Sequence, residues 1–108
     1  MKVRVLGIQS GTVVDGMTNQ EYVDKQIKYM EEAVEKEKPY LVAFPEMMTG
    51  IYFGMLREKK WFAEAEDFLT GPTTTRMLKE ARKLNIHIVY SVFEKAEENG
   101  KTMYYNTM

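Results

Sequence analysis

A helix with clearly marked ends, set between two apolar segments, is the feature that most constrains the fold of this chain. Thr18-Asn19-Gln20-Glu21 forms a capping box, in which a hydroxyl at the N-cap and a carboxylate three residues later bind the first free backbone N–H groups. Apolar residues then recur at the spacing of one helical face: Val23, Ile27, Met30 and Val34. The helix should end before Pro39, because the residue that precedes a proline is displaced from the helical region.

The apolar segments on either side of this helix predict two β-strands. Residues 2–9, KVRVLGIQ, are apolar on both faces, and residues 40–44, YLVAF, form a short apolar run between two prolines. A strand, a helix and a second strand in this order form a βαβ unit, so the two strands should be parallel neighbours. Residues 10–16 are expected to form the loop that joins the first strand to the helix.

The second half of the chain predicts a further helix. Residues 55–68 are expected to form a short helix or a structured loop, and Thr70-Gly71-Pro72 a turn. Residues 73–84 should then form an amphipathic helix that Asn85 closes at its C-terminal end. The apolar face of this helix is expected to carry Met77, Leu78, Ala81 and Leu84.

A strand and a hairpin are expected to follow. Residues 86–93, IHIVYSVF, predict one buried strand. Asn99-Gly100 is a strong signal for a two-residue hairpin turn, so residues 103–108 should begin the returning strand. Together the segments predict a single α/β domain over residues 1–108.

The composition excludes several classes of function. The 108 residues carry 15 basic and 16 acidic side chains, so no basic face is implied and nucleic acid is not an expected partner. No segment approaches the roughly 20 apolar residues that cross a bilayer, and the N-terminus does not resemble a leader, so we expect no membrane contact and a cytoplasmic location. There is no cysteine and one histidine, His87, which disfavours a disulfide, a zinc site or a Ser-His-Asp triad within these residues.

Glu46 is the main candidate for chemistry. It follows the apolar run of residues 40–44, which places it at the carboxyl end of a predicted parallel strand, where α/β sheets bind their ligands. A carboxylate beside a buried strand is costly unless it is paired or used. Two interpretations stay open from the residues alone. Glu46 could cap the following turn by accepting backbone N–H groups, or it could act as a general base or acid, with Thr49 as a hydrogen-bonding neighbour.

The motif around Glu46 resembles that of the nitrilase, or carbon-nitrogen hydrolase, superfamily. The resemblance rests on Pro45-Glu46, Thr49-Gly50 and the aromatic pair Tyr52-Phe53 after an apolar strand. It continues in the family's order and spacing through Gly71-Pro72-Thr73, residues 86–91 and Tyr105-Asn106-Thr107, so that it covers nearly the whole chain. Residues 55–68 look closest to the β-ureidopropionase and N-carbamoyl amide hydrolase branch.

This resemblance implies a fold and a mechanism. Family members stack two sheets between two helix layers, so residues 1–108 should form the N-terminal half of a four-layer αββα sandwich, an incomplete domain that associates into homo-oligomers when intact. Family members hydrolyse non-peptide C–N bonds with a Glu, a Lys and a Cys through a thioester-type intermediate, with release of ammonia. Glu46 matches the glutamate. The family's lysine and cysteine come later in its sequence than the motifs found in these residues, so the 108 residues alone should be inactive.

The resemblance also implies a small-molecule substrate, a linear amide or N-carbamoyl compound, and neither a metal nor an organic cofactor. Tyr52 and Phe53 could line the substrate pocket or could be packing residues, and Asn106 could hydrogen-bond loops near the site. Trp61, Phe62 and His87 are expected to be structural. Without its remaining strands, the piece should expose apolar surface.

Two rival functions stay open. One is a truncated, non-catalytic relative that acts as an interaction or regulatory module, which the absent lysine and cysteine would favour. The other is an unrelated flavodoxin-like binding domain, for which Ser10-Gly11-Thr12 would be a thin phosphate loop.

Overall fold

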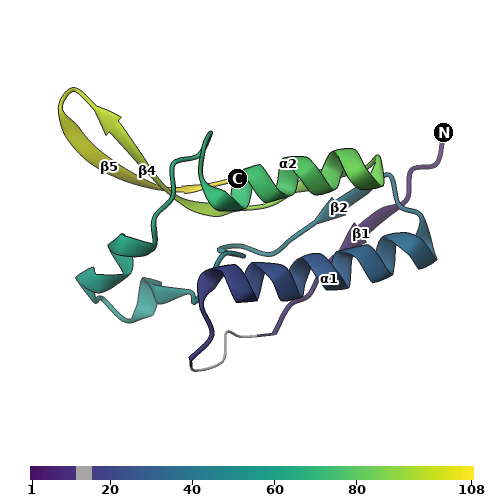
Figure 1. Ribbon diagram of the computed structural model, residues 1–108, viewed down its shortest axis with the longest axis horizontal. Helices are drawn as coiled ribbons and strands as arrows, with labels where there is room; N and C mark the ends of the chain where they lie inside the picture. Colours follow the sequence, from purple (N-terminus) through teal and green to yellow (C-terminus); the bar gives the residue numbers. More distant parts are fainter. Residues whose placement is uncertain (12–15) are drawn as a thin grey trace.

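A three-stranded parallel sheet with two helices on one face forms the centre of the molecule (Figure 1). The structure is a computed structural model that describes residues 1–11 and 16–108. Strands β1 (Val5–Gly7), β2 (Leu41–Ala43) and β3 (His87–Val89) lie in the order β1-β2-β3, and all pairs are parallel. Helix α1 (Asn19–Glu37) joins β1 to β2, and helix α2 (Pro72–Leu84) precedes β3. The α/β class and the predicted βαβ unit are confirmed.

The capping box at the start of α1 is confirmed. The Glu21 N–H donates to the Thr18 hydroxyl at 3.2 Å, and the Thr18 N–H donates to the Glu21 carboxylate at 2.8 Å. The Thr18 N–H and, secondly, the Thr18 hydroxyl, which also donates to the Glu21 carboxylate at 2.9 Å, lower the pKa of Glu21. The helix ends at Glu37, and its C-cap Lys38 has a left-handed φ of 46° that turns the chain before Pro39, as predicted. The loop expected at residues 10–16, and with it Ser10-Gly11-Thr12, lies partly outside the described residues.

The core lies between the helices and one face of the sheet. Leu6, Val42 and Ile88 occupy equivalent positions on the three strands and lie in or against one buried cluster to which both helices contribute. The buried helix residues of this cluster are Val23, Ile27, Met30, Val34 and Met77. The other face of the sheet is open, because Val5 and His87 are exposed and Leu41 is only half-buried. The expectation that the strand of residues 40–44 is fully buried is wrong at Tyr40, which precedes β2 and is exposed, and at Leu41 and Ala43, which face the open side of the sheet and are half-buried.

Helix α2 begins at a tightly built corner. Gly71 is its N-cap and Pro72 its first residue, and the Glu66 carboxylate accepts hydrogen bonds from the N–H and hydroxyl of Thr73 at 2.9 and 2.7 Å. Asn85 ends the helix with a left-handed φ of 52°, as predicted. The predicted apolar face is correct at Met77, which is buried, but wrong at Leu78, which points into solvent.

The strand predicted over residues 86–93 is two strands in two sheets. β3 ends at Val89, and after Tyr90 and Ser91 the chain starts β4 (Val92–Glu98), which pairs antiparallel with β5 (Lys101–Thr107). Asn99 and Gly100 have φ values of 51° and 75°, so the hairpin turn is confirmed. The hairpin projects away from the sheet at the upper left of Figure 1. Between β2 and α2 the chain forms two 3₁₀ helices, η1 (Phe53–Met55) and η2 (Lys59–Glu64), in the segment predicted as a short helix or structured loop.

Candidate functional site

The carboxyl ends of the parallel strands come together at one edge of the sheet. A hollow of about 200 Å³ lies there between the segments that follow β1 and β2. Its walls are Ser10, Gly11, Tyr22, Pro45, Glu46, Met47, Gly50, Ile51 and Tyr52. The Tyr22 hydroxyl, which reaches across from α1, donates to the Gly11 carbonyl and lies 3.2 Å from the Ser10 hydroxyl. This position matches the general location of ligand sites in open parallel sheets.

Glu46 stands at the edge of this hollow with its side chain exposed. The expectation of a buried carboxylate is wrong, because β2 ends at Ala43 and the turn after Pro45 carries Glu46 out beyond the sheet. Its Oε1 accepts a hydrogen bond from the side-chain amide of Asn106 at 2.6 Å. Within the described part of the chain it accepts none from a backbone N–H or from Thr49, which is buried, so the capping interpretation is not supported.

Two buried polar side chains hold the turn that carries Glu46. The Ser91 hydroxyl accepts a hydrogen bond from the Met47 N–H at 2.5 Å and lies 3.2 Å from the Pro45 carbonyl, to which it donates. The Gln26 side chain, on the buried face of α1, donates to the Met48 carbonyl. Met47 has a left-handed φ of 52°, which costs an L-residue about 1–2 kcal/mol, and these contacts help to offset that cost. The turn is thus fixed from both sides.

The structure separates the two aromatic residues that follow the turn. Tyr52 is exposed and lines the hollow beside Glu46. Phe53 is half-buried in an aromatic cluster, where its ring lies 4.8 Å from Phe93 and 6.3 Å from Trp61 between centroids. Phe62 and Tyr104 complete the cluster, with their rings 4.6 Å apart. Phe53 is therefore placed as a packing residue in this structure, and Trp61 and Phe62 are packing residues as predicted.

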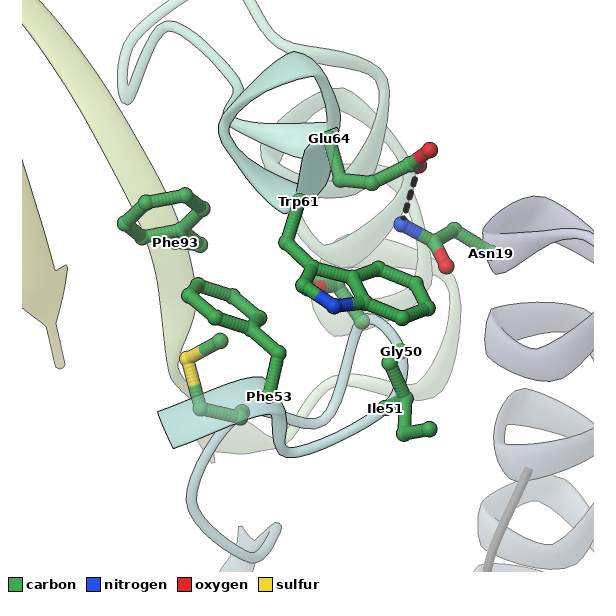
Figure 2. A pocket seen from close by; sticks show the side chains of 9 residues that line it. Asn19, Gly50, Ile51, Phe53, Trp61, Glu64 and Phe93 are labelled. Carbon is green, nitrogen blue, oxygen red and sulfur yellow. Dashed lines mark hydrogen bonds between the residues drawn. The ribbon is translucent and has the colours of Figure 1, made fainter. Parts of the chain in front are cut away.

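Figure 2 shows how this cluster closes against α1. Phe53 stacks on Trp61 and meets Phe93 on its other side, and the Asn19 amide donates to Glu64 at 2.8 Å next to the Trp61 ring. The enclosed volume is about 10 Å³, room for no more than one water molecule. A Cβ at position 50 would lie 2.4 Å from the Asn19 side-chain oxygen, so Gly50 permits this close packing. The space is a packing seam and offers no ligand site.

The single histidine lies away from the hollow. His87 is the first residue of β3, so it lies at the amino ends of the strands, whereas the hollow lies at their carboxyl ends. Its ring lies 4.5 Å from that of Tyr40. Its predicted structural role fits this position. Over residues 1–11 and 16–108, no three histidine or carboxylate side chains gather as they would around a metal ion, and no helix is long and apolar enough to cross a membrane.

Three polar residues of the site were not identified from the sequence: Gln26, Ser91 and Tyr22. Gln26 carried a usable signal, because it lies three residues after Val23 and four before Met30, on the apolar face of the helix. Ser91 is the one small polar residue in the apolar run of residues 86–93. Tyr22 offered no signal, since a tyrosine near the start of an amphipathic helix is ordinary. The suggestion that Asn106 hydrogen-bonds near the site is confirmed.

Comparison with known proteins shows the family of this chain. A family model described as carbon-nitrogen hydrolase matches residues 2–108. The chain is 27% identical to an N-carbamoylputrescine amidase from Solanum tuberosum over 94 residues, which are 87% of this chain. It spans about 30% of the length of that relative, whose name agrees with the N-carbamoyl amide hydrolase branch that the sequence resembles. This chain belongs to the carbon-nitrogen hydrolase family.

Proposed function

We propose that the intact protein hydrolyses a non-peptide C–N bond of a small linear amide or N-carbamoyl compound and releases ammonia. The observation that carries the proposal is the placement of Glu46, in a turn held on both sides, at the carboxyl end of a parallel strand in a chain that belongs to the carbon-nitrogen hydrolase family. The N-carbamoyl amidase among its relatives supports the substrate class.

In the proposed mechanism Glu46 is the general base. It takes the proton of a cysteine thiol, whose sulfur attacks the carbonyl carbon, and passes that proton to the leaving amine. It then removes a proton from the water that attacks the thioester, and the thiol is regenerated. A lysine ammonium stabilises the oxyanion. No cysteine occurs among the 108 residues, so we propose that the cysteine and the lysine of the site belong to chain outside residues 1–108.

The hollow beside Glu46 suits one side of a substrate site. It is open to solvent and bordered by Tyr52 and by the Ser10–Gly11 backbone. Tyr52 offers an apolar ring and a hydroxyl to a small polar substrate. Phe53, the next residue, packs against Phe93 and so helps to hold the segment that carries Tyr52. We propose Tyr52 as the substrate contact and Phe53 as its support.

The open face of the β1-β2-β3 sheet fits the larger architecture that the family implies. Its outward positions include Val5, Leu41 and Val89, and an apolar layer against them would complete an αββα sandwich. We propose that the intact protein has this four-layer fold, works as a homo-oligomer in the cytoplasm, and uses no metal or organic cofactor.

Glu46→Gln in the intact protein tests the proposed function. The amide cannot accept the thiol proton, so kcat for ammonia release from an N-carbamoyl amine should fall by about 10²–10⁴. Glu97→Gln is the matched control, because Glu97 is an exposed carboxylate near the turn of the hairpin, and it should leave kcat unchanged. Turnover of Glu46→Gln within a few-fold of the unsubstituted protein would refute the role of Glu46.

A second candidate function is a non-catalytic interaction or regulatory module. The observation that favours it is the absence of cysteine from these residues. Ammonia release by the intact protein, with rates that depend on Glu46, would exclude it.

A further inference from the structure

We propose that the base of the β4–β5 hairpin is a positioning clamp for Glu46, in which Ser91 fixes its backbone and Asn106 orients its carboxylate. The inference rests on the proposed function and deepens it, because it assigns how the general base is held. Ser91 immediately precedes β4, and Asn106 lies on β5 opposite Phe93, so both belong to the same end of the hairpin.

Ser91 acts on the peptide groups on either side of Glu46. Its hydroxyl accepts from the Met47 N–H at 2.5 Å and donates to the Pro45 carbonyl at 3.2 Å, so one oxygen joins the residues before and after the glutamate. The side chain is only 6% exposed, and water does not readily replace these bonds. The position and direction of the Glu46 Cα–Cβ bond therefore follow from Ser91.

Asn106 acts on the carboxylate itself. Its amide donates to Oε1 at 2.6 Å, while Oε2 accepts no hydrogen bond among the residues that the structure describes. One oxygen is thus fixed, and the other is available for proton transfer. A neutral amide suits this purpose because a lysine or arginine there would form an ion pair and stabilise the charged carboxylate more strongly.

The exposure of the Asn106 contact separates positioning from folding. Both partners lie at the surface, where a hydrogen bond adds little net stability because water replaces it. Loss of the Asn106 amide should therefore leave the fold intact and release the carboxylate to rotate. Ser91 is buried, so its loss should affect both the stability of the turn and the rate.

The decisive experiment compares variants of the intact protein by steady-state kinetics of ammonia release and by thermal melting. Asn106→Ala should lower kcat by about 10- to 100-fold, as a misplacement near 1 Å can, with KM and melting temperature little changed. Tyr105→Phe is the matched control: it removes a hydroxyl from the adjacent residue of β5 that bonds Glu98, and it should leave kcat unchanged. Unchanged kcat in Asn106→Ala would overturn the inference.

A double variant and a conservative variant distinguish positioning of Glu46 from a purely structural role. Adding Asn106→Ala to Glu46→Gln should cause no further loss of kcat, because the base is already gone, and an independent additional loss would overturn the clamp. Ser91→Thr keeps the hydroxyl and should retain more activity than Ser91→Ala. Equal kcat in these two Ser91 variants would contradict the role of the Ser91 hydroxyl.

A measurement that does not depend on turnover tests the clamp separately from the proposed function. In ¹H–¹⁵N spectra the side-chain amide signals of Asn106 should shift in Glu46→Gln and stay in place in Glu97→Gln. If Glu46→Gln retains full turnover, the proposed function fails and the clamp fails with it. If Glu46→Gln is inactive while Asn106→Ala is fully active, or if the amide signals do not respond, the clamp alone fails.

Discussion

Gly71→Ala should destabilise the protein through the corner at which α2 begins. Gly71 has an ordinary φ of −63°, so an alanine would suffer no backbone strain there. Space is the obstacle, because a Cβ at this position would lie 2.4 Å from the Asp67 carbonyl oxygen and 2.9 Å from the Glu66 carboxylate. Ordinary contact begins at 3.4 Å, so the Asp67 backbone has to move by about 1 Å.

The magnitude follows from what this movement breaks. Overpacking against backbone costs about 1–3 kcal/mol. The Gly71 N–H donates to the same Asp67 carbonyl at 2.8 Å, and the displaced Glu66 carboxylate caps α2 through Thr73. Loss of a helix cap costs about 1 kcal/mol. Together these terms predict a decrease of roughly 2–4 kcal/mol in the free energy of unfolding.

Urea unfolding followed by circular dichroism measures this decrease. Gly11→Ala is the matched control, because no atom of the described residues lies within 4 Å of a Cβ there and its φ is not left-handed, so its free energy of unfolding should change by less than about 0.5 kcal/mol. Equal unfolding midpoints for Gly71→Ala, Gly11→Ala and the unsubstituted protein would refute the reasoning, since the close approach of residue 71 to Asp67 would then not exist in solution.

Two further predictions concern the hairpin turn and pH. Gly100→Ala places a Cβ at φ 75° in open space, so backbone strain alone should lower the free energy of unfolding by about 1–2 kcal/mol in the same urea assay, and an unchanged midpoint would contradict the left-handed turn. The Thr70 hydroxyl and N–H, with that of Leu69, lower the pKa of Asp67 below its ordinary value of 3.8. A lowered folded-state pKa gives stability that is present above pH 3.8 and is lost as the pH falls through the folded-state value. The melting temperature of the unsubstituted protein should therefore decrease more steeply than that of Asp67→Asn below about pH 4, and parallel curves would contradict this.

Elements encoded by local chemistry could be predicted from the sequence. The capping box at Thr18, the left-handed end at Asn85 and the Asn99-Gly100 turn each depend on a few adjacent residues whose preferences agree with the fold. The parallel pairing of β1 and β2 followed from the helix between them. For the same reason Glu46 could be placed at a strand end before its surroundings were known.

Burial and side-chain partners could not be predicted, because they depend on distant segments. Glu46 has an apolar run before it, yet its exposure depends on where β2 ends and on what covers the sheet edge. Its partner Asn106 is 60 residues away in sequence, and Ser91 is 44 residues away from Met47. Leu78 fits a helical stripe by spacing, but no element of the described structure packs over it.

The most consequential wrong prediction was the single strand over residues 86–93. Every residue of that run except His87 and Ser91 is apolar or aromatic, and an apolar run alone cannot show where one sheet is left and another begins. The break falls at Tyr90 and Ser91, and it redirects the chain so that the hairpin starts beside the end of β2. With this break, Ser91 lies within hydrogen-bond distance of the turn after β2, and Asn106 within hydrogen-bond distance of Glu46. The break between β3 and β4 therefore connects the parallel sheet, which carries Glu46, to the hairpin, which holds it. The apolar pattern of residues 86–93 gives no sign of this break, although the site is assembled there.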